Sequence, residues 1–152
     1  MDKEFLINKA KDLKQPSNKA AEEFASKRDI LANKVTIAMK ARTDLYKLIG
    51  KDNLPMMEDN HRNKAKFMES VFYLHNPEVL VDTVLWVFRA YRSHGFELTY
   101  WPAQLDTWVR TLKEELTPTS FSEIYPFYNF LITNQASFVS LSDVHLTKAH
   151  SH

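Results

Sequence analysis

Two histidines lie close to the most apolar stretch of the chain, and they are the residues best placed to bind a ligand. His75 precedes this stretch and His94 follows it. A single histidine on a helix could bind a haem iron as an axial ligand. The alternative is that both imidazoles sit in the last turns of helices, where a positive charge suits the helix dipole. Both interpretations are open from the sequence.

Aromatic side chains surround His94 and make it the better pocket candidate. Trp86 and Tyr91 precede it, and further aromatic residues follow it within a few positions. Arg89 could contribute to a buried anion site, or it could form a simple ion pair with another helix. The candidate ligand-binding residues are His75, Trp86, Arg89, Tyr91, His94, Tyr100 and Trp101.

The sequence contains no catalytic signature and no complete metal site. Glu58 and His61 are spaced to share one helix face, which is half of a di-iron bundle motif, but a second such pair is missing. Because the chain has no cysteine, thiolate catalysis, disulfides and cysteine-based zinc or iron–sulfur sites are all excluded. No nucleophile elbow of a serine hydrolase is present. We therefore expect a protein that is not an enzyme and that holds no metal.

Residues 76–95 are expected to form the helix around which these candidates are arranged. Asn76 is a good N-cap, Pro77 suits the first helical position, and Gly95 can end the helix. The residues between these ends are mostly apolar on every side, which predicts a helix buried in the middle of the fold. The valine content leaves a β-strand as an alternative. Residues 55–75 are predicted to form the preceding helix, as an antiparallel neighbour of the central one.

A long helical stripe precedes these two helices. Ser17 is a suitable N-cap, Gly50 ends the segment, and apolar residues recur at intervals of seven along residues 17–49. Two interpretations compete. The helix breaks near residues 28–34, or it projects as a continuous helix and pairs with another chain. The second interpretation predicts a homodimer formed through residues 17–49.

Composition favours an all-α protein with a single domain. The chain of 152 residues has only two glycines, so it has little material for hairpin turns. We predict an N-terminal arm or short helix over residues 1–16, a helical domain over residues 17–143 and a flexible tail over residues 144–152. The domain is expected to be globin-like or an irregular bundle of about six helices with a long N-terminal helix. Pro126 predicts a kink or a restart within the last helix.

Charge and hydropathy limit the partners of the chain. A formal net charge of +1 gives no general attraction to nucleic acid or to an anionic membrane surface. The central apolar segment is shorter than the about 20 residues that a membrane-spanning helix needs. The first residues are charged and lack the apolar core of a signal peptide. These features predict a cytoplasmic protein that binds neither nucleic acid nor membrane.

The order of features from residue 60 onward resembles that of a known family. The matching residues are Asn60, Asn63, Phe67, Pro77, Leu80, Trp86, residues 89–96, Leu105, Trp108 and Leu112. In this order they resemble the non-haem, globin-like or phycocyanin-like helical sensor domains of bacterial stress-response and signalling proteins. The resemblance covers about residues 55–140 and implies a globin-like fold, a dimerising N-terminal helix and a signalling role. Such domains are usually fused to an output domain, so a free-standing version would signal by binding another protein.

These observations predict a small sensory or regulatory module that acts through protein–protein contacts. The alternative function is the binding of haem, another tetrapyrrole or another small ligand in a pocket near His94 or His75.

Overall fold

The computed structural model describes residues 2–150, and the side chains of residues 2–143. Within this part the regular secondary structure is entirely helical, with no strand, which confirms the all-α prediction. This part contains eight helices rather than about six. They are α1 (Lys3–Ala10), α2 (Asn18–Lys40), α3 (Leu45–Ile49), α4 (Leu54–Tyr73), α5 (Pro77–Ser93), α6 (Tyr100–Glu115), α7 (Pro118–Thr133) and α8 (Gln135–His150).

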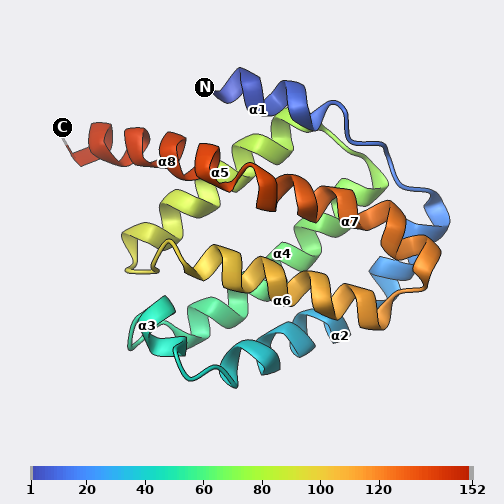
Figure 1. Cartoon of the computed structure of the whole chain (residues 1–152), viewed down its shortest axis with the longest axis horizontal. Coiled ribbons are helices and arrows are strands. Elements are labelled where there is room, and N and C mark those ends of the chain that lie inside the picture. Colours follow the sequence, from blue (N-terminus) through green and yellow to red (C-terminus); the bar gives the residue numbers. More distant parts are fainter. Residues whose placement is uncertain (1, 151–152) are drawn as a thin grey trace.

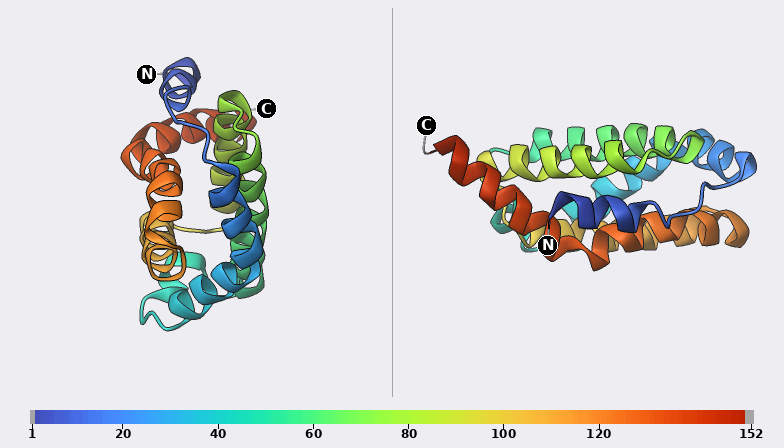
Figure 2. Two further views of the ribbon diagram at one scale, coloured as in Figure 1. Left: turned by 90° about the vertical axis from the view of Figure 1, so that its right-hand side faces the viewer. Right: turned by 90° about the horizontal axis from the view of Figure 1, so that it is seen from above.

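The helices are arranged in two layers. Figure 2 shows α4 and α5 on one side of the molecule and α6 and α7 on the other. α2 packs against α4, α6 and α7, whereas α5 makes its main helix contacts with α1 and α8, which crosses it in Figure 1. We expected α4 and α5 to be close neighbours because a tight turn joins them. The two helices lie in the same layer (Figure 2), but α5 packs mainly in a group with α1 and α8, whereas α4 belongs to a group around α2. The space between these two groups contains the site described below.

α5 has the ends that its sequence predicts. The side chain of Asn76 accepts a hydrogen bond from the backbone N–H of Val79, and Pro77 occupies the first helical position. Gly95 follows the helix with a φ of +95°, a conformation that favours glycine. The prediction that α5 is buried on all sides is wrong, because Trp86 is 63% exposed. One face of the helix is packed, and another borders an open space.

α2 runs through residues 28–34 without a break and ends at Lys40. The chain turns there, where the guanidinium of Arg42 donates two hydrogen bonds to the carboxylate of Asp44, at 2.8 and 3.0 Å. The apolar stripe of α2 faces the protein's own core, since Phe24 and Leu31 are fully buried. These stripe residues are therefore engaged within one chain. The exposed apolar residues of α2 lie on its outer face.

Hydrogen bonds from one carboxylate join α2 to the start of α7. The carboxylate of Glu23 accepts hydrogen bonds from the backbone N–H of Thr117 at 2.7 Å and from the hydroxyls of Thr117 and Ser120, each at 2.8 Å. Burial alone would raise the pKa of Glu23, but these hydrogen bonds outweigh it and lower the pKa to about 2. Glu23 thus serves as a cap for α7 supplied by another helix.

The C-terminal part of the chain is more continuous than predicted. α7 passes through Pro126 without a restart, and α8 extends to His150, into the segment predicted as a tail. Residues 151 and 152 of that segment lie outside the described residues. In the described part of the chain no helix has both the length and the apolar character needed to cross a membrane.

Candidate functional site

A cavity of about 500 Å³ lies between α5 on one side and α4 and α6 on the other. Most of the side chains around it are apolar or aromatic. They are Met56, Asn60, Asn63, Lys64, Phe67, Met68, Thr83, Val84, Trp86, Val87, Phe88, Ala90, Tyr91, His94, Trp101, Leu105 and Leu131. A concave, mainly apolar space of this size, with few polar groups, is typical of a small-molecule binding site.

The walls of the cavity follow from helical spacing. On α5 the lining positions include Thr83, Val87 and Ala90, which recur at intervals of three and four and therefore share one helix face. Thr83 and Ala90 are small, so this face does not fill the space in front of it. Phe88 of α5 stacks on Trp101 of α6, with ring centroids 4.6 Å apart and planes 6° from parallel. This ring pair bridges the two helices at one wall of the cavity.

His94 and Trp86 border the cavity and are also exposed to solvent. The Nδ1 atom of His94 lies 2.8 Å from the backbone oxygen of Ala90, to which it donates. The lone pair of the imidazole is consequently on Nε2. This arrangement, with one ring nitrogen bonded to a backbone carbonyl, is the one in which a histidine usually binds a metal through its other nitrogen.

Lys64 introduces a cationic group into this apolar environment. Its Nζ atom donates to the Oε1 atom of Gln104 at 3.2 Å and lies 5.7 Å from the ring centroid of Tyr128. Part of its side chain stays accessible because it borders the cavity. Burial lowers the pKa of Lys64 to about 7, and among the described residues no carboxylate offsets that effect. At neutral pH a substantial fraction of Lys64 is therefore an uncharged amine.

A buried network of hydrogen bonds fixes the group that faces Lys64. Asn60 Oδ1 accepts from Gln104 Nε2 and from the hydroxyl of Tyr100, each at 2.8 Å. Because the amide nitrogen of Gln104 is engaged with Asn60, its oxygen is turned toward Lys64. The network orients the only hydrogen-bond partner of this ammonium in the described part of the chain.

His61 forms the far end of this network. Its Nε2 atom lies 3.2 Å from the hydroxyl oxygen of Tyr100, and its Nδ1 atom lies 2.7 Å from the hydroxyl of Thr36. Since the Tyr100 proton is donated to Asn60, His61 Nε2 donates to Tyr100, and Nδ1 accepts from Thr36. Burial, together with the nearby charges of Lys64 and Arg62, lowers the pKa of His61 to about 3. His61 is therefore a neutral structural residue.

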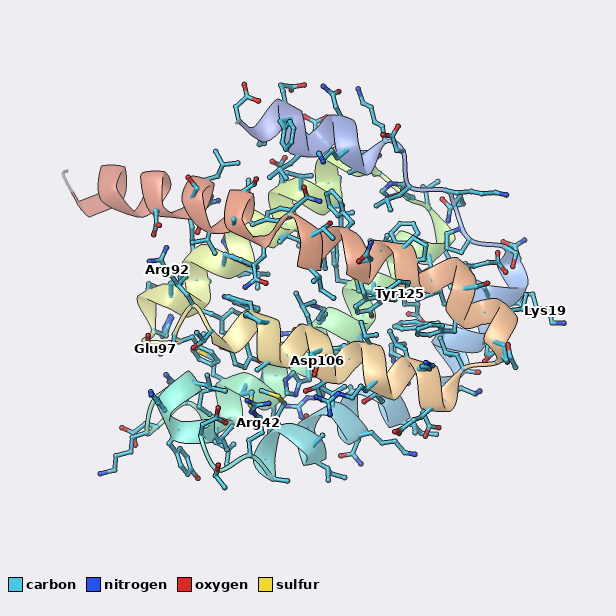
Figure 3. All side chains as sticks on the ribbon, viewed as in Figure 1. Lys19, Arg42, Arg92, Glu97, Asp106 and Tyr125 are labelled. Carbon is cyan, nitrogen blue, oxygen red and sulfur yellow. The ribbon has the colours of Figure 1, made fainter. Side chains whose placement is uncertain are left out.

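The cavity includes Trp86, Tyr91, His94 and Trp101 of the seven predicted site residues. Tyr100 lies behind Trp101, in the buried network, and Arg89 is half-buried outside the lining. Its neighbour Arg92, near the end of α5, points toward α8 and forms an ion pair with Asp143 (Figure 3).

His75 lies in a different part of the molecule. Its Nε2 atom donates to the backbone oxygen of Ala10 at 2.8 Å, and its ring packs edge-on against Phe127. The side-chain oxygen Oε1 of Gln15 accepts from the backbone N–H of His75. These contacts attach α1 and the following loop to the turn between α4 and α5. His75 is not among the residues that line the cavity.

The sequence prediction missed two residues of the candidate site, which are Lys64 in the cavity lining and its hydrogen-bond partner Gln104. A signal for Lys64 existed, since Asn60 and Lys64 recur on the otherwise apolar face of α4. The half metal site does not form, because His61 points inward while Glu58 forms an ion pair with Lys40. Over the described residues no group of three potential ligands could hold a metal ion.

Comparison with known proteins gives no relative of this chain. No protein-family model matches it, and neither a curated protein nor a solved structure is similar to it. The resemblance to globin-like sensor domains therefore stays a prediction, and the function has to be argued from the site itself.

Proposed function

We propose that this protein binds one small, mainly apolar molecule in the cavity, and that occupancy of the cavity regulates its contacts with a partner protein. The observation that supports this most directly is an apolar cavity of about 500 Å³ lined by one lysine, Lys64, which has no carboxylate partner among the described residues. The ligand that suits it has an apolar body and one oxygen-containing head group that accepts a hydrogen bond from Lys64.

The chemistry of the walls supports the binding step. Each methylene that a ligand transfers from water into the cavity contributes about 0.8 kcal/mol. Apolar burial thus supplies affinity, and the few polar groups supply orientation.

The arrangement of helices supports the regulatory step. α5 forms one wall of the cavity but packs mainly on α1 and α8, whereas the opposite wall belongs to the group of helices around α2. A bound ligand contacts both groups at once, so it stabilises one relative position of the two. The predicted homodimer through residues 17–49 would use the outer face of α2, where Ile30 and Ile37 are 53% and 60% exposed.

Titration with a neutral apolar dye such as Nile red tests the binding step. We expect one dye per chain and energy transfer from Trp86 and Trp101, because both line the cavity. Val84→Trp fills the cavity and should weaken binding at least about tenfold. Val79→Trp is the matched control, since Val79 is 49% exposed on the same helix and lies outside the lining. Equal binding by Val84→Trp and the wild type would overturn the proposal.

A tetrapyrrole is the second candidate ligand, and the geometry of His94 favours it. The hydrogen bond from Nδ1 to Ala90 leaves Nε2 to bind an iron. Haemin titration tests this candidate. A Soret band that disappears in His94→Ala and persists in His75→Ala would support axial ligation by His94. A protein that stays colourless with haemin rules this candidate out and leaves the colourless apolar ligand.

A further inference from the structure

We infer that Lys64 is a Schiff-base lysine, which forms an imine with an apolar aldehyde bound in the cavity. The inference rests on the proposed function, because the aldehyde has to occupy the same cavity. It specifies that the head group of the ligand is an aldehyde. It also makes Lys64 a residue that reacts covalently with the ligand and does not merely contact it.

The groups around Nζ favour a carbonyl compound over a carboxylate. A buried ion pair is stable only when further hydrogen bonds satisfy the remaining lone pairs of the anion. Among the described residues, Nζ lies beside the oxygen of Gln104 and near the ring of Tyr128, and neither of these groups donates a hydrogen bond to an anion. A neutral aldehyde carries no negative charge, so it does not need these additional hydrogen-bond donors. Its reaction needs an amine with an available lone pair and space beside that amine.

The site holds the amine in the form and place that the reaction requires. Burial lowers the pKa of Lys64 to about 7, and desolvation in an apolar pocket is a known way to activate a lysine nucleophile. Gln104 Oε1 accepts from either the ammonium or the amine, and its bond to Asn60 keeps this oxygen in place. Lys64 lines the cavity, so an aldehyde bound there lies next to this side chain.

The reaction balances without any co-reactant. The lone pair of Nζ attacks the carbonyl carbon, a C–N bond forms, and the carbonyl oxygen becomes a hydroxyl. The C–O bond then breaks, and the oxygen leaves as water with both protons of the amine. The products are the imine and one water molecule, which can leave through the open side of the cavity beside His94 and Trp86. The apolar walls limit the access of water that would hydrolyse the imine.

The test is incubation of the full chain with octanal at pH 7, reduction with cyanoborohydride, and peptide mapping by mass spectrometry. We expect one alkyl group per chain, located on Lys64. Lys66 is the matched control, because it is exposed on the same helix two residues away. At pH 7 a pKa of about 7 gives Lys64 an about thousandfold larger fraction of free amine than an ordinary lysine. We expect labelling of Lys64 to be at least about tenfold faster than that of Lys66.

Two variants and one competitor separate the possible outcomes. Lys64→Met should abolish the single adduct, and Lys66→Met should leave it unchanged. Octanol, which occupies the cavity without reacting, should protect Lys64. Labelling spread over the surface lysines, or an adduct that octanol does not reduce, overturns the inference. If Nile red binds but Lys64 is not labelled, the Schiff base alone is wrong. If neither binds, the proposed function fails as well.

Discussion

Two of the aromatic clusters in the described part of the chain have a histidine at the border, and they differ in packing. Around His75, Phe72 packs edge-on against both Phe24 and Phe127, with centroids 4.9 and 5.4 Å apart. Around His94, the aromatic rings form the wall of a cavity of about 500 Å³. Both histidines are ligand candidates in the sequence, with His94 the better one, and their surroundings in the structure differ.

The difference arises from what covers each cluster. α1 and the loop after it close the first one, because His75 donates to Ala10 and the side chain of Gln15 bonds the backbone at both Phe72 and His75. The second cluster has α5 over it, whose facing residues Thr83 and Ala90 are too small to fill the space. Tight packing stabilises the fold at one site. The unfilled volume at the other site is available to a ligand.

The largest difference in stability between the two clusters is expected for two matched Phe→Ala substitutions on α4. Phe72→Ala removes a fully buried ring from the filled cluster and should lower the free energy of unfolding by about 3–5 kcal/mol. Phe67→Ala removes the same ring from a residue that lines the cavity, where one side has no packing partner, and should cost about 1 kcal/mol. Urea denaturation measures both values. Equal losses would show that the cavity wall is packed as tightly as the core.

The sequence predicted those helix ends that depend on residues close to them in the chain. The ends of α5 were correct because Asn76, Pro77 and Gly95 act on backbone groups close to themselves. The end of α2 at Lys40 was missed, since no proline or glycine marks it, and an ion pair between Arg42 and Asp44 holds the turn. The ion pair between Arg42 and Asp44 is not one of the sequence patterns that mark the end of a helix.

The candidate site was predicted only in part, for a different reason. Aromatic residues near His94 were identified because they are close in sequence. The cavity itself depends on how far α5 lies from α4 and α6, and no local pattern encodes that distance. The valines of α5 were interpreted as core residues, although Val84 and Val87 line the cavity. Apolar residues around a ligand site and apolar residues in a core have the same sequence pattern.

Lys64→Met tests how much the buried lysine beside the cavity lowers the free energy of unfolding. Removing a buried cation that has no carboxylate partner in the described part of the chain should raise the free energy of unfolding at pH 7 by about 1–3 kcal/mol. The folded pKa of about 7 is below the unfolded value of 10.5, so between these values the unfolded chain binds more protons. Wild-type stability should therefore rise by about 2 kcal/mol from pH 7 to pH 9, and that rise should be absent in Lys64→Met.

Denaturation at a series of pH values up to 9 measures this difference. The range stops there because the pKa of Tyr100 is raised by burial, so tyrosine ionisation contributes to unfolding at higher pH. Lys66→Met provides the control and should keep the wild-type slope. A stability of Lys64→Met lower than that of the wild type would mean that Lys64 has a stabilising partner.

His61→Gln tests the network below the cavity with a smaller expected effect. The folded pKa of His61, about 3, is below the unfolded value of 6.5, so its stabilising contribution is lost as the pH falls between these values. Wild-type stability should drop by about 1.5 kcal/mol from pH 6.5 to pH 5 on this account. Glutamine does not titrate, so the drop should shrink in the variant. His75 and His94 are present in both proteins, and their contributions cancel in the difference.

Trp86→Ala has the smallest expected effect on stability and separates binding from folding. Its side chain is 63% exposed at the border of the cavity, so truncation should change the free energy of unfolding by less than about 0.5 kcal/mol. The same change removes a cavity wall and should weaken binding of an apolar dye. Burial of Phe88 against Trp101 is unaffected, which keeps the rest of the wall in place. A large loss of stability with unchanged dye affinity would reverse the roles assigned to the two clusters, since this tryptophan would then belong to the packed core.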